Sequence, residues 1–278
     1  MRPARVGAAA VVLVLLGGLP PSRLRAQDGE LFPEVSVQMM AVRYAATEDA
    51  FVWDGWIGAG AGLLRIKRVT GYFTADVETV IGREKRTFDA NQAAYHVELG
   101  ARARVGRHVI GPFFHHVSRH VVDRPKTDAV DWNIVGLRAA GPLPDGFPVP
   151  GRYAASVGQA VQRSTIGYRW EVTALVGADV VTAPWGAAYL LASVRAVTAE
   201  ERPRFPRGGF LDFVGEGGLR FPRGGRNLAV FVAYEHRNDV HVEMPGVKDR
   251  ALVGLRIGFA PGGSAGPNLP TSWPAPSR

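Results

Sequence analysis

Several stretches of this 278-residue chain alternate apolar and polar residues with a period of two. The clearest covers residues 72–81, where odd positions are mostly apolar and even positions mostly polar. The same split recurs over 92–105, 169–181 and 250–259. Because successive side chains of a β-strand point to opposite faces, this period predicts strands with one apolar and one polar face.

The length of the alternation decides between a soluble sandwich and a membrane barrel. Sandwich strands usually have about five or six residues, whereas a transmembrane strand needs about 9–11. The alternation here often continues that far, and after residue 26 no apolar run reaches the roughly 18 residues of a membrane-spanning helix. The sequence therefore predicts an all-β fold, a transmembrane antiparallel up-and-down β-barrel with its apolar faces toward lipid.

About twelve strands are expected, an even number as in closed bacterial barrels. Starting from a periplasmic N-terminus, connections after even-numbered strands are mostly short, whereas those after odd-numbered strands, such as 45–56 and 82–91, are longer and more charged. The Pro-rich connection 141–150 is the exception. The predicted strands lie near 34–44, 57–67, 70–81, 92–105, 107–118, 130–140, 151–162, 168–181, 186–198, 209–220, 227–238 and 249–260.

An export signal precedes the predicted barrel. Residues 1–26 combine Arg2 and Arg5 with the apolar run Val6–Leu19 and a candidate cleavage site after Ala26. This arrangement is typical of a secretory signal peptide, and the apolar run is short for the alternative, an uncleaved membrane anchor. We expect a barrel over 27–260 in the cell outer membrane, followed by a disordered Pro/Gly-rich tail over 261–278.

The formal charge of +8 and the pI near 10.2 suggest at first a nucleic-acid-binding protein. Four arginines leave with the signal segment and no acid does, so 29 basic and 25 acidic residues remain. The mature charge of +4 and the absence of any nucleic-acid-binding motif remove that interpretation. The expected partners are outer-membrane lipid and anionic lipopolysaccharide, touched by loops such as 83–86 and 202–207, and a monomer is favoured.

Charged residues of both signs are predicted to face the lumen. Since buried charges persist only when paired, we expect a stabilising network that plugs the barrel. A small-solute or ion-selective channel is the alternative, although wide aqueous channels usually need about 16 or more strands. The inward charged residues are Asp76, Glu78, Glu98, Arg102, Arg104, Arg169, Glu171, Asp179, Asp212, Glu216, Arg220, Glu235, Arg237, Arg250 and Arg256.

A histidine-rich segment ends the fifth predicted strand. Residues two apart on a strand share a face, so His116 and Ser118 point the same way, and Asp131 returns beside them across the hairpin. A serine nucleophile needs a base, and the base needs a group that holds its tautomer. Ser118, His116 and Asp131 are therefore the candidate catalytic residues.

These residues resemble the signature of the bacterial lipid A 3-O-deacylases, outer-membrane barrels with His-x-Ser on one strand and an acidic residue at the start of the next. The resemblance covers about 25 residues and implies Ser118 as nucleophile, His116 as base and Asp131 as the acidic member. The implied activity is hydrolysis of an ester-linked acyl chain of lipid A in the outer leaflet. The chain departs from that family in having Asp for Glu, a spacing one residue longer, Arg119 after the serine, and twelve predicted strands where the family has eight.

Two other interpretations of the same segment stay open. Phe113, Phe114 and Trp132, with the neighbouring histidines, are typical of the interfacial girdle of a barrel. His115, His116 and His120 are possible metal ligands, but adjacent histidines on a strand face opposite sides, so at most His116 and His120 converge. The sequence thus indicates no cofactor, and it leaves a non-catalytic structural or transport barrel as the alternative to an esterase.

Overall fold

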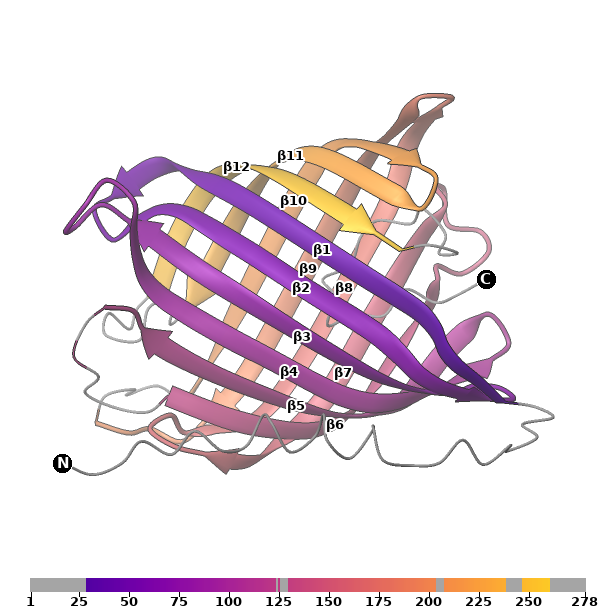
Figure 1. Ribbon diagram of the computed structural model, residues 1–278, viewed down its shortest axis with the longest axis horizontal. Helices are drawn as coiled ribbons and strands as arrows, with labels where there is room; N and C mark the ends of the chain where they lie inside the picture. Colours follow the sequence, from indigo (N-terminus) through magenta and orange to yellow (C-terminus); the bar gives the residue numbers. More distant parts are fainter. Residues whose placement is uncertain (1–28, 124, 126–129, 204–207, 239–246, 261–278) are drawn as a thin grey trace, which may run out of the picture.

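Twelve antiparallel strands close into one barrel, with each strand paired to its neighbours in sequence and β1 paired to β12 (Figure 1). The structure is a computed structural model that describes residues 29–123, 125, 130–203, 208–238 and 247–260. The predicted fold class and strand number are confirmed; the predicted signal segment and tail lie outside the described residues. The strands are β1 (Gly29–Glu48), β2 (Phe51–Ile66), β3 (Val69–Gly82), β4 (Asp89–Val105), β5 (His108–Val121), β6 (Val130–Pro142), β7 (Gly151–Arg163), β8 (Tyr168–Ala183), β9 (Gly186–Ala199), β10 (Gly209–Arg223), β11 (Arg226–Asn238) and β12 (Val247–Phe259).

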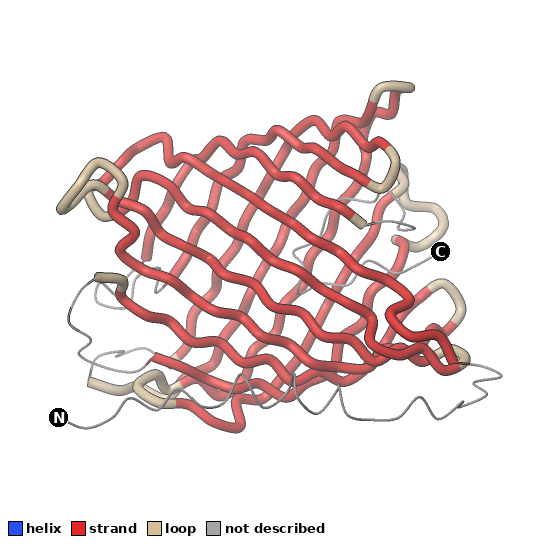
Figure 2. Tube along the Cα trace, in the orientation of Figure 1, coloured by secondary structure: helices blue, strands red, loops and turns tan. Residues whose placement is uncertain are grey.

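The alternation in the sequence becomes the two faces of the barrel wall. On β3, Tyr72, Thr74 and Asp76 point inward and are buried. Phe73, which lies between Tyr72 and Thr74, points outward and is 39% exposed. Outward side chains on other strands, such as Ile57 and Leu99, are more than half exposed. An apolar outer wall and a polar inner face are what a lipid-embedded barrel requires, because its backbone groups pair entirely between strands. Across the described ranges, no helix is long and apolar enough to cross a membrane, and Figure 2 shows only strands and loops.

Paired charges and aromatic rings fill the lumen. Arg237 on β11 reaches Glu78 on β3, 2.6 Å away, although three strands lie between them around the wall. Toward the end of the barrel near Phe113 and Trp132, an inward apolar cluster adds to the filling. The expected pairing of inward charges is confirmed at several positions: Glu98 with Arg138, Glu171 and Asp212 with Arg195, Asp179 with Arg220, and Glu216 with Arg256.

The two ends of the barrel differ in their connections. One end, which we call the short-turn end, carries two-residue turns and the longer connection 143–150, as predicted. At the other end, which we call the long-loop end, most consecutive strands are separated by more residues: six between β3 and β4, eight between β5 and β6, nine between β9 and β10, and eight between β11 and β12. Bacterial barrels have short periplasmic turns and longer extracellular loops, and the difference between the two ends is of the kind that the predicted orientation requires.

One predicted loop is wrong. Residues 45–56 were expected to connect the first two strands, but β1 and β2 continue through most of this segment and leave only a two-residue turn at 49–50. Tyr44 and Phe51 are almost completely buried inside the barrel and anchor the two strands there. Polar residues such as Asp54 gave the segment the composition of a loop, yet Asp54 points into the lumen, where it accepts a hydrogen bond from Tyr44.

Candidate functional site

The three predicted catalytic residues lie on the outer face of the barrel, near its long-loop end. Val117 and Arg119 on β5 are buried in the lumen, so the alternating residues between and beside them point outward. Ser118 pairs directly with Asp131 on β6, and on its other side with Tyr95 on β4, which is 44% exposed. The structure therefore brings Ser118, His116 and Asp131 onto one outward surface of two neighbouring strands.

His116 is held by a residue that the sequence reasoning did not select. Asn133 is its direct partner in the β5–β6 ladder, and its Oδ1 lies 2.6 Å from Nδ1 of His116. An amide oxygen only accepts hydrogen bonds, so this contact places the proton of the neutral imidazole on Nδ1. The other ring nitrogen, Nε2, is then a proton acceptor, as a general base must be.

Asp131 has other partners. Its carboxylate accepts a hydrogen bond from Nε2 of Gln162 on β7 at 2.7 Å, and its backbone N–H donates to Oγ of Ser164 at 3.0 Å. Among the described residues no hydrogen bond joins Asp131 to His116. The antiparallel register contains the reason: if Ser118 faces Asp131, then His116, two residues earlier, faces the residue two positions later, which is Asn133.

A second histidine contacts the serine. Nε2 of His120 lies 3.3 Å from Oγ of Ser118, and the His120 ring meets the edge of Tyr95 with 5.6 Å between ring centres. No hydrogen bond joins Ser118 to His116 in the parts of the chain that the structure describes. Ser118 thus sits between two outward imidazoles, one oriented by Asn133 and the other packed on an aromatic ring.

The fold brings no further metal ligands to His116 and His120 among the described residues. Over the described residues, no group of three or more histidine, cysteine or acidic side chains is placed to hold a metal ion. His115 points into the lumen and stacks on His96, with ring centres 5.6 Å apart, so it lies on the opposite side of the wall from His116.

Several outward aromatic residues lie toward the long-loop end. Tyr95 on β4, Trp170 on β8, Phe213 on β10 and Tyr234 on β11 are exposed on the outer wall toward the long-loop end. The amphipathic rings of tyrosine and tryptophan are stable at headgroup level. Because Tyr95 is the ladder partner of Ser118, the candidate site lies at the same level.

Two of the three predicted girdle residues are placed differently. Phe114 is exposed on the outer wall, as expected, but Phe113 and Trp132 are buried in the lumen. Both occupy inward positions of their strands. The ring of Phe113 lies under the guanidinium group of Arg138, and the ring of Trp132 lies under that of Arg119. The girdle prediction is therefore wrong for Phe113 and Trp132.

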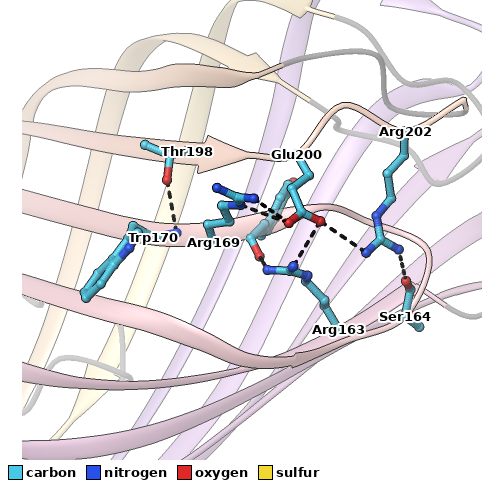
Figure 3. Close-up of polar contacts among 8 residues, drawn as sticks. Arg163, Ser164, Arg169, Trp170, Thr198, Glu200 and Arg202 are labelled. Carbon is cyan, nitrogen blue, oxygen red and sulfur yellow. Dashed lines mark hydrogen bonds and ion pairs between the residues drawn. The ribbon is translucent and has the colours of Figure 1, made fainter.

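Beside the candidate site lies a group that we call the arginine cluster, formed by Arg163, Arg169 and Arg202 around Glu200 (Figure 3). The closest contacts to the Glu200 carboxylate are 3.0 Å from Arg163, 2.6 Å from Arg169 and 3.7 Å from Arg202. Hydrogen bonds from Arg169, with the nearby positive charges, hold the pKa of the Glu200 carboxyl below its usual value. Arg169 was expected in the lumen, but a bulge at the start of β8 leaves its side chain more than half exposed at the rim.

The closed barrel and its apolar outer wall define the class of this protein: it is a β-barrel of the bacterial outer-membrane type. In structure it is similar to the calcium-bound outer membrane phospholipase dimer of Salmonella typhi, with a TM-score of 0.51, 10% identity and coverage of 81% of this chain and 90% of that one. An outer membrane channel from Pseudomonas putida F1 also matches, with a TM-score of 0.47, 10% identity and coverage of 83% and 96%.

A third match is a monoaromatic hydrocarbon channel, with a TM-score of 0.43, 8% identity and coverage of 84% of this chain and 88% of that one. No family model and no curated protein matches the sequence. The match to the Salmonella typhi barrel, at 10% identity, shows the fold alone, so the candidate site has to be argued from the residues of this chain.

Proposed function

We propose that the protein is a serine hydrolase that removes an ester-linked acyl chain from a lipid of the outer leaflet. The observation that carries the proposal is the outward Ser118 next to a histidine whose Nδ1 is held by Asn133. A serine on the inner face would meet only the filled lumen. On the outer wall, at the level of Tyr95, Ser118 meets the part of the membrane where acyl esters lie.

Each residue then has a defined task. Oγ of Ser118 attacks the acyl carbonyl while its proton passes to Nε2 of His116. The ester C–O bond breaks, and the same proton goes to the departing alkoxide. Water then attacks the acyl-serine while His116 takes its proton; the bond between Oγ and the acyl group breaks, the fatty acid leaves, and the proton returns from His116 to Oγ of Ser118. Asn133 holds the neutral imidazole in the required tautomer and keeps accepting from Nδ1 when Nε2 is protonated, a task that the sequence predicted for Asp131.

The resting contact of Ser118 with His120 fits this scheme. Catalytic hydrogen bonds are often long in a free enzyme and tighten only with substrate bound. A rotation about the Cα–Cβ bond of Ser118 turns Oγ from His120, two residues after it, toward His116, two residues before it. His120 therefore contacts the Ser118 hydroxyl in the resting rotamer, and His116 takes the hydroxyl proton in the reacting rotamer.

Two classes of lipid fit a site at this level. Lipid A is the substrate implied by the resemblance to the 3-O-deacylases. Phospholipid is the class that the name of the Salmonella typhi phospholipase gives, and this chain shares the fold of that barrel. Both lipids present an ester-linked acyl chain at the same depth of the membrane. A direct assay with each lipid decides which of the two is the substrate.

The test is mass spectrometry of lipids incubated with purified barrel in nonionic micelles, with lipid A and a diacyl phospholipid in separate reactions. We expect loss of one acyl chain from one of them, and loss of that activity in Ser118→Ala. Thr79→Val is the matched control, because it removes a hydroxyl from the outer wall of β3 while its neighbours Glu78 and Val80 keep the inward packing. Full activity in Ser118→Ala would overturn the proposal.

The second candidate is a non-catalytic structural barrel, favoured by the packed lumen. Buried ion pairs such as Glu216 with Arg256 rigidify the wall and occupy the space that a transport path needs. This candidate predicts that neither lipid changes mass with wild-type protein.

A further inference from the structure

The arginine cluster carries more positive charge than its partner neutralises. Three guanidinium groups surround the single carboxylate of Glu200, which leaves a surplus of two positive charges among these four side chains. The lowered pKa keeps Glu200 ionised, so this surplus does not change near neutral pH. Arg202 is fixed further by a 2.8 Å hydrogen bond from Nη1 to the carbonyl oxygen of Ser164.

The geometry leaves donors directed away from Glu200. Arg169 uses Nε and Nη2 on one carboxylate oxygen, at 3.0 and 2.6 Å, and its side chain is still 58% exposed. Arg163 is anchored to the carbonyl oxygen of Tyr168 at 2.6 Å through Nη1. A guanidinium has five N–H donors in a fixed fork that matches phosphate oxygens. Glu200 and the carbonyl oxygens of Ser164 and Tyr168 therefore orient the three guanidinium groups before any ligand binds.

The position of the cluster determines which phosphate it meets. Arg169 (Figure 3) directly precedes Trp170, whose ring is exposed on the outer wall near the start of β8, toward the long-loop end as for the other outward aromatics. Ser164, which anchors Arg202, also accepts the backbone hydrogen bond of Asp131, the ladder partner of Ser118. The cluster thus borders the candidate hydrolase site at headgroup level, where the phosphates of anionic lipids lie.

We propose that Arg163, Arg169 and Arg202 form a binding site for the phosphate group of an anionic outer-leaflet glycolipid such as lipid A. Binding uses none of Ser118, His116 or Asn133, so it does not depend on the proposed hydrolysis. If the protein is a hydrolase, the site selects phosphorylated lipids by holding the headgroup while the acyl chains lie along the outer wall.

The experiment measures the Kd for phosphorylated lipid A in nonionic micelles, in a Ser118→Ala background that keeps the lipid intact. The double variant Arg169→Gln, Arg202→Gln is expected to weaken binding about tenfold or more, since it removes charged hydrogen-bond donors. Arg107→Gln is the control, because Arg107 is about as exposed as Arg169, 62% against 58%, but pairs with Asp145 at the short-turn end. It is expected to bind within about twofold of the parent.

Dephosphorylated lipid A and inorganic phosphate complete the test. Dephosphorylated lipid A is expected to bind as weakly as the double variant binds the intact lipid. Equal affinity for the two forms of lipid A, or an unchanged Kd in a double variant that migrates as a folded barrel, would overturn the proposal. Inorganic phosphate that binds as tightly as the lipid would overturn the lipid assignment. Arg169→Lys retains the charge without the fork and is expected to fall between the parent and the double variant.

Discussion

Oδ1 of Asn133 lies 2.6 Å from Nδ1 of His116, and the two residues are direct partners across the β5–β6 ladder. If this contact fixes the imidazole for catalysis, Asn133→Ala lowers kcat/KM for lipid hydrolysis by roughly 10- to 100-fold. Asn133→Asp retains an acceptor and is expected to lose less.

Asp131→Asn is the informative comparison, because the Asp131 carboxylate is bonded to Gln162 rather than to His116. We expect its kcat/KM to stay within about threefold of wild type, since the tautomer of His116 is unchanged. A larger loss in Asp131→Asn than in Asn133→Ala would return the orienting role to Asp131.

The two histidines beside Ser118 have different expected effects. His116→Gln removes the oriented base, and we expect it to lower kcat nearly as far as Ser118→Ala does. His120→Gln removes only the resting partner of the hydroxyl and is expected to retain about a tenth or more of the activity. Steady-state kinetics of both variants on the same lipid decide the assignment, and the reverse order would make His120 the base.

Much of the barrel follows from the sequence. Because lipid covers the outer face and polar groups fill the inner one, the alternation of apolar and polar residues decides which side chains of each strand point outward. The same parity rule shows why some assignments failed: Phe113 and Trp132 are aromatic but lie on inward positions of β5 and β6. Whether Asn133 or another residue of β6 faces His116 depends on the register between β5 and β6. Loop composition does not reveal that register. The arginine cluster joins residues from β7, β8 and the 200–208 connection, so no local pattern predicts it.

Buried ion pairs in the lumen are expected to be costly to break. Glu216 accepts hydrogen bonds from Arg256 at 2.7 and 2.8 Å and from the Tyr189 hydroxyl at 2.6 Å, and all three side chains are buried. Glu216→Gln leaves the Arg256 charge without a counter-ion and should destabilise the barrel by about 3–5 kcal/mol in guanidinium unfolding.

The control for this pair is Glu48→Gln at the exposed rim. Glu48 pairs with Lys248 at 2.6 Å, but its side chain is 54% exposed, so the expected loss is about 0–1 kcal/mol. The double variant Glu216→Leu, Arg256→Met removes both buried charges together and should recover part of the stability lost in Glu216→Gln. Equal losses at the two sites would show that burial does not govern these pairs.

The ionisation of Glu200 offers a direct measure of the arginine cluster. The pKa of its carboxyl is lowered chiefly by the hydrogen bonds from Arg169, so Arg169→Gln should raise it toward the ordinary glutamate value. A lowered pKa means that this contribution to stability is complete above the unfolded-state pKa and is lost as the pH falls through the folded-state value. A carboxyl NMR titration of isotopically labelled protein checks both the direction and the effect of the variant, and an unchanged Glu200 pKa would contradict it.

The packed lumen leads to a prediction for ion flow. Arg237 reaches from β11 to Glu78 and Asp54 on the far side of β12 and β1, at 2.6 and 3.5 Å, and so crosses the interior. We expect no stable conductance steps from wild-type protein in planar lipid bilayers, because side chains occupy the path. The double variant Arg237→Ala, Glu78→Ala removes both charges with their side-chain volume and should admit water, which would appear as small, salt-dependent current steps. Large steady currents through the wild-type barrel would show instead that the network rearranges to open a channel.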